Sequence, residues 1–208
     1  MSDTPRVGIL ISGRGSNMVA LVEAMRSGAI GADPAVVLSN IPDALGLERA
    51  AELGVPTEVI DSKRVKPRKV HERQVIERLR AYKVDLVCLA GYMRLLTAEI
   101  ISEYRNRILN IHPSLLPAFP GLDAQQQALD HGVKLAGCTV HIVDEECDHG
   151  PIILQSSVDV HDTDTVDTLS ARILEQEHLL YPRAVDLVCS GRIRIDGRHV
   201  MPSTRSAS

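Results

Sequence analysis

The chain has 208 residues, of which 44% are hydrophobic and 24% charged, a balance that suits one globular domain with an apolar core. Aromatic residues make up only 2% and the net charge is -4, so the sequence has neither the stacking residues nor the basic surface of a nucleic-acid-binding protein. With no membrane-spanning run, no signal-peptide pattern and no C-x-x-C pair among four cysteines, it predicts a cytoplasmic protein without a metal site.

Strand and helix patterns alternate through the first half of the chain. Short apolar runs predict strands over 6–12, 35–39, 56–60, 85–90 and 108–111. Helical spacing of apolar residues predicts helices over 16–26, 45–53, 68–82 and 97–104. Because this alternation builds parallel sheets covered by helices on both faces, we predict an α/β fold, a Rossmann-like three-layer sandwich.

The pattern changes after residue 135. Residues 136–143 and 152–160 predict two long strands in an antiparallel extension of the sheet, and residues 164–189 predict the longest helix. Residues 191–200 fit a weak terminal hairpin. We expect one domain over 1–201 and a flexible tail over 202–208.

A glycine-rich loop joins the first predicted strand to the first helix, with the sequence Ser-Gly-Arg-Gly-Ser-Asn at 12–17. Backbone N–H groups at such a helix start can hold a phosphate, so we expect Gly15, Ser16 and Asn17 to bind one. Met18 stands where a dinucleotide fingerprint needs glycine, and no lysine follows as a Walker A loop requires. A plain glycine turn remains the alternative.

Asn110, His112 and Asp148 place an amide, an imidazole and a carboxylate near the end of a predicted buried strand. Asn110 and His112 are two residues apart, so their side chains point to the same side of an extended strand. The carboxyl edge of a parallel sheet is where ligands bind in open α/β folds. If Asp148 lies beside His112, the three groups suit oxyanion stabilisation and proton transfer, as in acyl or formyl transfer.

Each of these three residues also has an ordinary structural interpretation. His112 fits a buried histidine with satisfied hydrogen bonds, Asn110 fits a turn, and Asp148 fits a solvated acidic loop. Cys88 and Cys138 lie in apolar runs and are interpreted as small buried side chains.

Two predicted helices have an inner face that can be identified from spacing. The helix over 68–82 should bury Val70, Ile76 and Leu79. In the longest helix, Glu177 falls on the apolar stripe formed by Val166, Leu169, Ile173, Leu180 and Ala184. A carboxylate on an apolar face needs a polar partner, so Glu177 either accepts hydrogen bonds from ligand hydroxyls or reaches water at the edge of the stripe.

Four segments together resemble the glycinamide ribonucleotide formyltransferases of the folate-dependent formyltransferase family. These segments are ISGRGSN at 11–17, LAGYMRLL at 89–96, LNIHPSLLPAFPG at 109–121 and GCTVHIVDEECDHGPIILQ at 137–155. The similarity extends over almost the whole chain, from about residue 6 to residue 200.

The resemblance implies transfer of the formyl group of 10-formyltetrahydrofolate to the amine of glycinamide ribonucleotide in de novo purine biosynthesis, without a metal. By position, Asn110, His112 and Asp148 match the catalytic trio. The remaining matches are Gly15, Ser16 and Asn17 for phosphate, Glu177 for ribose, and Arg68, Met93, Arg94, Leu95, Leu96, Val143 and Asp144 for folate. The family also implies a cis X–Pro bond near Leu116–Pro117 and a monomer or homodimer.

The chain departs from the family pattern at two places. Leu122, Asp123, Ala124 and Gln125 follow a Pro-Gly pair where the family often has histidines, and His149 follows Asp148 where it often has glycine. Three rival functions remain open: a formyltetrahydrofolate hydrolase, a methionyl-tRNA formyltransferase and a non-catalytic nucleotide-binding protein. The first two carry an extra N- or C-terminal domain, for which the sequence offers no segment.

Overall fold

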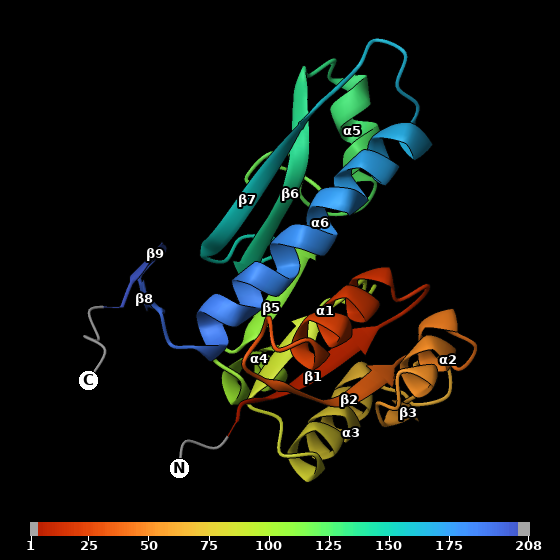
Figure 1. The fold of residues 1–208 in the computed structure, drawn as a ribbon. Helices are drawn as coiled ribbons and strands as arrows, with labels where there is room; N and C mark the ends of the chain where they lie inside the picture. Colours follow the sequence, from red (N-terminus) through yellow and green to blue (C-terminus); the bar gives the residue numbers. More distant parts are fainter. Residues whose placement is uncertain (1–3, 204–208) are drawn as a thin grey trace.

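The computed structural model describes residues 4–203, which form a seven-stranded sheet with helices on both faces (Figure 1). The strands lie in the order β3-β2-β1-β4-β5-β6-β7. Their bounds are β1 (Arg6–Ile11), β2 (Asp33–Ser39), β3 (Thr57–Val59), β4 (Leu86–Leu89), β5 (Ile108–His112), β6 (Leu135–Ile142) and β7 (Ile152–Asp159). Strands β1 to β5 pair in parallel, whereas β6 and β7 pair antiparallel, which confirms the predicted extension.

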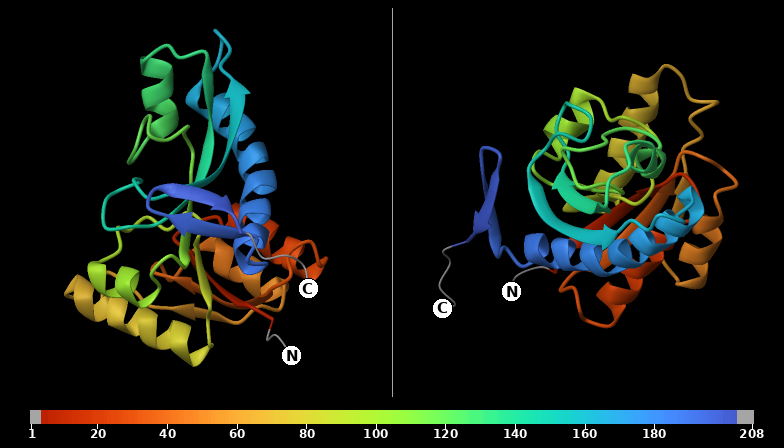
Figure 2. Two further views of the ribbon diagram at one scale, coloured as in Figure 1. Left: turned by 90° about the vertical axis from the view of Figure 1, so that its left-hand side faces the viewer. Right: turned by 90° about the horizontal axis from the view of Figure 1, so that it is seen from above.

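The described residues form six helices, divided between the two faces of the sheet (Figure 2). Their bounds are α1 (Ser16–Arg26), α2 (Leu45–Glu52), α3 (Arg68–Ala81), α4 (Ala98–Glu103), α5 (Ala124–Asp130) and α6 (Val166–Cys189). One apolar core contains side chains from α1, α2 and α6, and the other contains side chains from α3 and α4. The predicted three-layer α/β sandwich is therefore confirmed.

Two details of the helices differ from the sequence predictions. Val70 is 39% exposed rather than inward, because the buried face of α3 is rotated to include His71 and Glu72 together with Val75, Ile76 and Leu79. Helix α5 was not predicted because only Ala124 and Ala128 are buried in it, so its sequence has almost no apolar stripe.

The C-terminal segment forms the predicted hairpin, made of β8 (Ile193–Asp196) and β9 (His199–Pro202). It is a separate two-stranded sheet that projects from the end of α6 near β7 (Figures 1 and 2). Strand β9 includes Pro202, the first residue of the predicted tail, and residues 204–208 lie outside the described residues.

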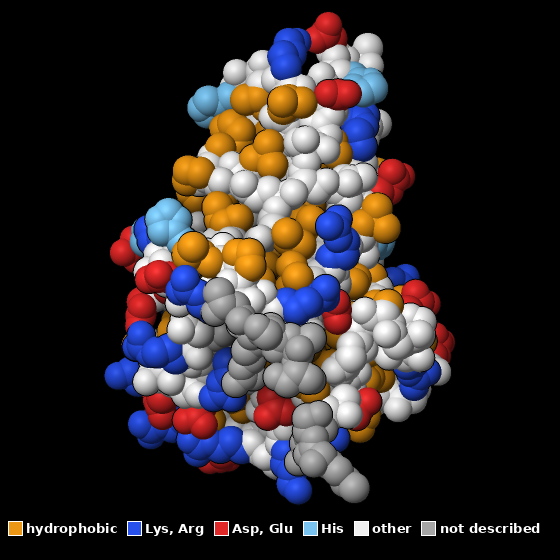
Figure 3. All heavy atoms as spheres, turned by 60° about the vertical axis from the view of Figure 1, so that its left-hand side comes forward, with side chains coloured by type: hydrophobic (Ala, Val, Ile, Leu, Met, Phe, Trp, Pro, Cys, Tyr) orange, Lys and Arg blue, Asp and Glu red, His pale blue; other side chains and the backbone are white. Residues whose placement is uncertain are grey.

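The face of the molecule on the hairpin side has a mixed surface (Figure 3). Apolar side chains gather over the half that holds β6 and β7, and basic and acidic side chains alternate over the other half. Within residues 4–203, no helix is both long and apolar enough to cross a membrane.

Candidate active site

Asn110 and His112 lie at the carboxyl end of β5, where the parallel strands meet the antiparallel pair β6–β7. Across the β5–β6 ladder, Asn110 lies opposite His141 and His112 lies opposite Thr139. The side chain of His112 is nearly buried, at 5% exposed. Strand alternation thus directs both predicted residues to one side, and the antiparallel register adds a second histidine beside them.

Asp148 closes this group from the loop between β6 and β7. Its Oδ2 atom lies 3.4 Å from Nδ1 of His112 and accepts a hydrogen bond of 2.8 Å from the Gly121 N–H, and its Oδ1 atom lies 3.7 Å from Nε2 of His141. Asp148 has a positive φ of 51°, a backbone conformation that this packing holds in place. The structure therefore brings Asn110, His112 and Asp148 together.

The charge state of Asp148 follows from these contacts. Burial alone would raise the pKa of its carboxyl, but hydrogen bonds from His141 and the Gly121 N–H, together with the charge of His112, lower it well below its usual range. Asp148 is therefore a carboxylate at every physiological pH.

Both ring nitrogens of His112 face oxygen acceptors. Nδ1 faces Asp148, and Nε2 donates to the Phe119 carbonyl over 2.9 Å. Because the Phe119 carbonyl can only accept, Nε2 of His112 carries the proton of this hydrogen bond. A substrate oxygen that accepts from Nε2 must therefore replace the Phe119 carbonyl.

His141 is a site residue that the sequence analysis did not identify. It is 2% exposed, and its Nδ1 lies 2.9 Å from the Ile142 carbonyl, which can only accept. Its Nε2 atom lies 3.2 Å from the Asn110 amide nitrogen and 3.7 Å from Oδ1 of Asp148, so it faces both of these site residues. Only the β5–β6 register shows that His141 faces Asn110, because the two residues are 31 positions apart in the chain.

The loop after His112 is fixed to β6 and β7 by one hydroxyl. Thr139 Oγ1 donates to the Ser114 carbonyl over 2.7 Å, and accepts hydrogen bonds from the Leu116 N–H and from the Gln155 amide. The Leu116–Pro117 peptide bond is cis, as predicted. These contacts direct the chain from β5 toward Phe119.

Tyr181 of α6 holds β4 and β5 together just before their functional ends. Its side chain is fully buried, and its hydroxyl lies 3.1 Å from the Leu89 carbonyl and 3.0 Å from the Leu109 carbonyl. Leu109 directly precedes Asn110. The longest helix therefore fixes the spacing of the two strands that carry the site.

The glycine loop has a shape that only glycine permits at position 15. Gly15 has a φ of 71°, and a Cβ atom there would lie 2.8 Å from the Cα atom of Gly46, at the start of α2. No side chain caps α1, so the N–H groups of its first turn, at Ser16 and Asn17, have no partner within the helix. The loop can therefore present these N–H groups to an anion.

Glu177 lies beside this loop and points inward, as predicted. It is 7% exposed, and its Oε2 atom accepts a hydrogen bond of 2.6 Å from the Asn17 amide. Burial raises the pKa of Glu177 to about 7, although the bond from Asn17 opposes this shift. Among the described residues, the buried Oδ1 atom of Asn17 has no hydrogen-bond partner, so it is free to accept one from a ligand.

A cavity of about 470 Å³ connects the glycine loop to the end of β5. Its walls include Gly13, Ser16 and Glu177 at one end, and Ile111 and Pro113, the two neighbours of His112, at the other. The residues predicted to bind phosphate and ribose hydroxyls thus line one cavity that ends next to the Asn110–His112–Asp148 group.

The segment predicted to hold the pterin borders the same cavity. Met93 and Leu95 are 70% and 62% exposed, and the buried Nε atom of Arg94 has no partner within residues 4–203. Leu96 and Val143, from the two predicted parts of the folate pocket, both pack against the apolar core that holds α3 and α4. The exposed apolar side chains can contact the face of a flat ring such as a pterin, and the unpaired buried Nε of Arg94 can donate to a polar atom on the edge of that ring.

Arg68 is tied to this segment by a network centred on Glu72. The Arg68 guanidinium donates to the Leu95 carbonyl, and to Glu72 over 3.0 Å. Glu72, which is 2% exposed, also accepts from the N–H and the hydroxyl of Thr97, the N-cap residue of α4. Helix α3 therefore fixes both Arg68 and the end of the 93–96 segment.

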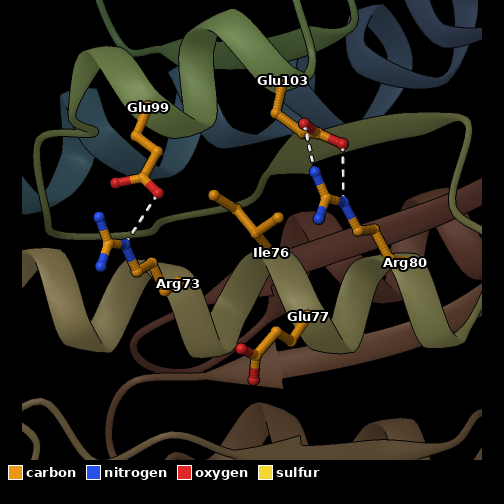
Figure 4. A pocket seen from close by; sticks show the side chains of 6 residues that line it. All are labelled: Arg73, Ile76, Glu77, Arg80, Glu99 and Glu103. Carbon is orange, nitrogen blue, oxygen red and sulfur yellow. Dashed lines mark hydrogen bonds and ion pairs between the residues drawn. The ribbon is translucent and has the colours of Figure 1, made fainter.

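A second, smaller cavity of about 260 Å³ lies between α3 and α4 (Figure 4). Four of its charged side chains form two exposed ion pairs, Arg73 with Glu99 and Arg80 with Glu103, and Glu77 also lines it. Exposed ion pairs of this kind contribute little to stability. No three His, Cys, Asp or Glu side chains within residues 4–203 gather as metal ligands, and the metal-free reaction stays a prediction.

The comparisons with known proteins agree on one family. The profile of the family described as Formyl transferase matches residues 5–185. The chain is 39% identical over 206 residues to the phosphoribosylglycinamide formyltransferase of Escherichia coli (strain K12), covering 96% of this chain and 97% of that protein. It is 48% identical over 188 residues to the trifunctional purine biosynthetic protein adenosine-3 of Drosophila melanogaster, covering 89% of this chain but only 14% of that protein.

A solved structure, glycinamide ribonucleotide transformylase 1 from Symbiobacterium toebii, superimposes with a TM-score of 0.95 at 52% identity, covering 97% of this chain and 95% of that chain. The family profile, the sequence identity and the fold therefore indicate the same family. The chain belongs to the formyl transferase family and, within it, groups with the phosphoribosylglycinamide formyltransferases.

Proposed function

We propose that this protein transfers the formyl group of 10-formyltetrahydrofolate to the amine of glycinamide ribonucleotide, a step of de novo purine biosynthesis. The observation that carries the proposal is the contact of 3.4 Å between His112 and Asp148 beside a cavity lined by Ser16, Asn17 and Glu177. The groups proposed for catalysis thus lie next to the residues proposed to bind ribose and phosphate.

Glycinamide ribonucleotide fits this cavity in one direction. The N–H groups of Gly15, Ser16 and Asn17 hold the phosphate, since the start of α1 is uncapped. Glu177 accepts hydrogen bonds from the ribose hydroxyls. The amine then extends toward Ile111 and Pro113, the residues that flank His112.

The formyl donor fits beside the same end of β5, next to the cavity. Its pterin lies between the 93–96 segment and Val143–Asp144, with Met93, Leu95 and Leu96 as apolar contacts and Arg94 as a donor. Arg68 provides a positive charge near the rest of the folate. In this arrangement one domain carries a phosphate-binding N-terminal half and a folate-binding, catalytic C-terminal half.

The chemistry is direct transfer. The amine attacks the formyl carbon, and the carbonyl oxygen becomes an oxyanion that accepts from Nδ2 of Asn110 and Nε2 of His112 once it replaces the Phe119 carbonyl. Asp148, acting through water, takes a proton from the attacking amine and delivers it to N10 of the folate as the C–N bond breaks. The numbers of atoms and protons balance without a covalent enzyme intermediate.

One assay separates this function from its rivals. The protein is mixed with a 10-formyl-folate analogue whose deformylated product absorbs differently, with and without glycinamide ribonucleotide. Product that requires the amine supports the transferase. Product without the amine indicates a hydrolase, and no product in either mixture indicates a non-catalytic binding protein or a formyltransferase with another acceptor, such as methionyl-tRNA.

A cytoplasmic location and a monomeric or homodimeric state belong to the same proposal. All four cysteines have free thiols, which fits a reducing compartment. Sedimentation of the purified protein measures the oligomeric state.

A further inference from the structure

Three side chains in contact with one another join the terminal hairpin to the loop that carries Asp148. Asp144 Oδ2 lies 3.0 Å from Nδ1 of His149, and Nη1 of Arg198, in the turn of the hairpin, lies 2.7 Å from Nε2 of the same ring. The other terminal nitrogen of Arg198 donates to the His149 carbonyl over 2.7 Å. The contacts span 49 residues of sequence and join two separate sheets.

The His149 ring lies between a carboxylate and a guanidinium. Asp144 Oδ2 contacts Nδ1, and Nη1 of Arg198 lies near both ring nitrogens, 2.7 Å from Nε2 and 3.1 Å from Nδ1. The three side chains thus form a row with opposite charges at its two ends. A glycine at position 149 could make neither side-chain contact.

The loop between β6 and β7 has two ends with different anchors. Its Asp148 end is held from inside, by His112, His141 and the Gly121 N–H. Its base is closed at Gly150, where a Cβ atom would lie 1.8 Å from the Ile142 carbonyl oxygen. Its Asp144 end lies at the surface. Among the described residues, the side-chain contacts that it receives from other parts of the chain are the link through His149 to Arg198 and a longer ion pair of 3.9 Å between Arg105 and Glu145.

We propose that the β8–β9 hairpin is a strap that positions the Asp144 end of this loop for the formyl donor, with Arg198 as the positioning residue and His149 as the connector. This inference rests on the proposed function, which places Val143 and Asp144 in the folate pocket. Arg198 acts through His149 and touches no reacting group. Loss of the Arg198 side chain should therefore weaken binding of the folate more than it slows the chemical step.

Kinetics of Arg198→Ala test the strap against a matched control. Arg194→Ala removes the same charge from the same hairpin, but within residues 4–203 the side-chain partners of Arg194 are Asp196 and Met201, both inside the hairpin. Since exposed charged contacts contribute modestly, we expect Arg198→Ala to raise the KM for the formyl donor about threefold to fivefold, with kcat and the KM for glycinamide ribonucleotide nearly unchanged. Arg194→Ala should match the wild type.

Conservative variants separate the strap from a general effect on folding. His149→Gln keeps one donor and one acceptor and should retain most of the donor affinity, whereas His149→Leu should behave like Arg198→Ala. Arg198→Lys, which can reach only one of its two acceptors, should be intermediate. If kcat falls and both KM values, for the formyl donor and for glycinamide ribonucleotide, rise together in all these variants, the positioning role is wrong.

Hydrogen exchange provides a readout that does not depend on activity. Amides of residues 144–149 should exchange faster in Arg198→Ala than in Arg194→Ala, while those of β5 stay protected. If the wild type fails to transfer formyl groups, the proposed function is wrong, and the exchange data still report on the strap. If the wild type is active but the two arginine variants agree in KM and in exchange, the strap is wrong.

Discussion

The side-chain amide of Asn17 donates to the carboxylate of Glu177 across 2.6 Å, and so joins the first turn of α1 to the middle of α6. Both residues are buried, at 8% and 7% exposed, and both border the cavity. The pKa of Glu177 is raised to about 7 because burial disfavours its charge. Because the folded protein and the unfolded chain bind the Glu177 proton with different affinities, the free energy of unfolding depends on pH.

The first prediction concerns Glu177→Gln. A folded-state pKa raised from 4.5 to about 7 means that the folded protein binds the proton more tightly than the unfolded chain. The stabilising effect of protonation is complete below pH 4.5 and is lost as pH rises through 7. Between pH 4.5 and 8 the wild type should therefore lose up to about 3 kcal/mol of unfolding free energy relative to Glu177→Gln.

Urea unfolding of both proteins at several pH values measures this difference, because all other titrating groups cancel in the comparison. At pH 8 Glu177→Gln should be the more stable protein and should bind glycinamide ribonucleotide more weakly. If the free energies of unfolding of the two proteins differ by the same amount at every pH from 4.5 to 8, Glu177 titrates normally.

Gly15→Ala tests the shape of the phosphate loop. The left-handed backbone and the contact of 2.8 Å with Gly46 should make this change destabilising by about 2 kcal/mol and should weaken phosphate binding. Gly13→Ala is the matched control, since its Cβ atom would have no neighbour within 4 Å. Equal unfolding midpoints for the two variants would contradict the requirement for glycine at position 15.

His141→Leu tests the second histidine. Its hydrogen bond is a main cause of the lowered pKa of Asp148, so its loss should raise that pKa. A depressed carboxyl pKa stabilises the protein above the usual carboxyl range, and this stability is lost as pH falls. The variant should unfold more readily near neutral pH, and the acidic limb of its kcat–pH profile should move upward.

The exposed residue His161 serves as the control for this experiment, since His161→Leu should leave the kcat–pH profile unchanged. If the acidic limb of His141→Leu coincides with that of the wild type, His141 does not set the charge state of Asp148.

The sequence predicted the parts of this molecule that local patterns specify. Strand alternation placed Asn110 and His112 on one side, and helical spacing placed Glu177 on the inner face of α6. The approach of Asp148 to His112 and the contact between His141 and Asn110 depend on the pairing of β5 with β6, which joins residues about 30 positions apart. Val70 was misplaced because a polar pair, His71 and Glu72, occupies the inner face of α3 through long-range hydrogen bonds.

Tyr181→Phe tests the link between α6 and the two central strands. The change removes one hydroxyl that contacts two buried carbonyls, and we expect it to lower the unfolding free energy by about 1 to 3 kcal/mol. Tyr82→Phe, at a less buried site, should cost less. If Tyr181→Phe unfolds at the wild-type urea concentration, the hydroxyl does not hold β4 and β5.

His112→Ala tests the chemistry most directly. Nε2 of His112 is proposed to donate to an oxygen that becomes negatively charged only during the reaction, so its removal should lower kcat about 100- to 1000-fold with little change in substrate affinity. Asn110→Ala should show the same pattern, and the double variant should lose less than the product of the two single losses, because both groups act on one oxygen. Single-turnover rates together with equilibrium titration of glycinamide ribonucleotide separate the two quantities. Near wild-type turnover in His112→Ala, or a loss confined to affinity, would remove His112 from the catalytic step and leave the Phe119 contact as its main role.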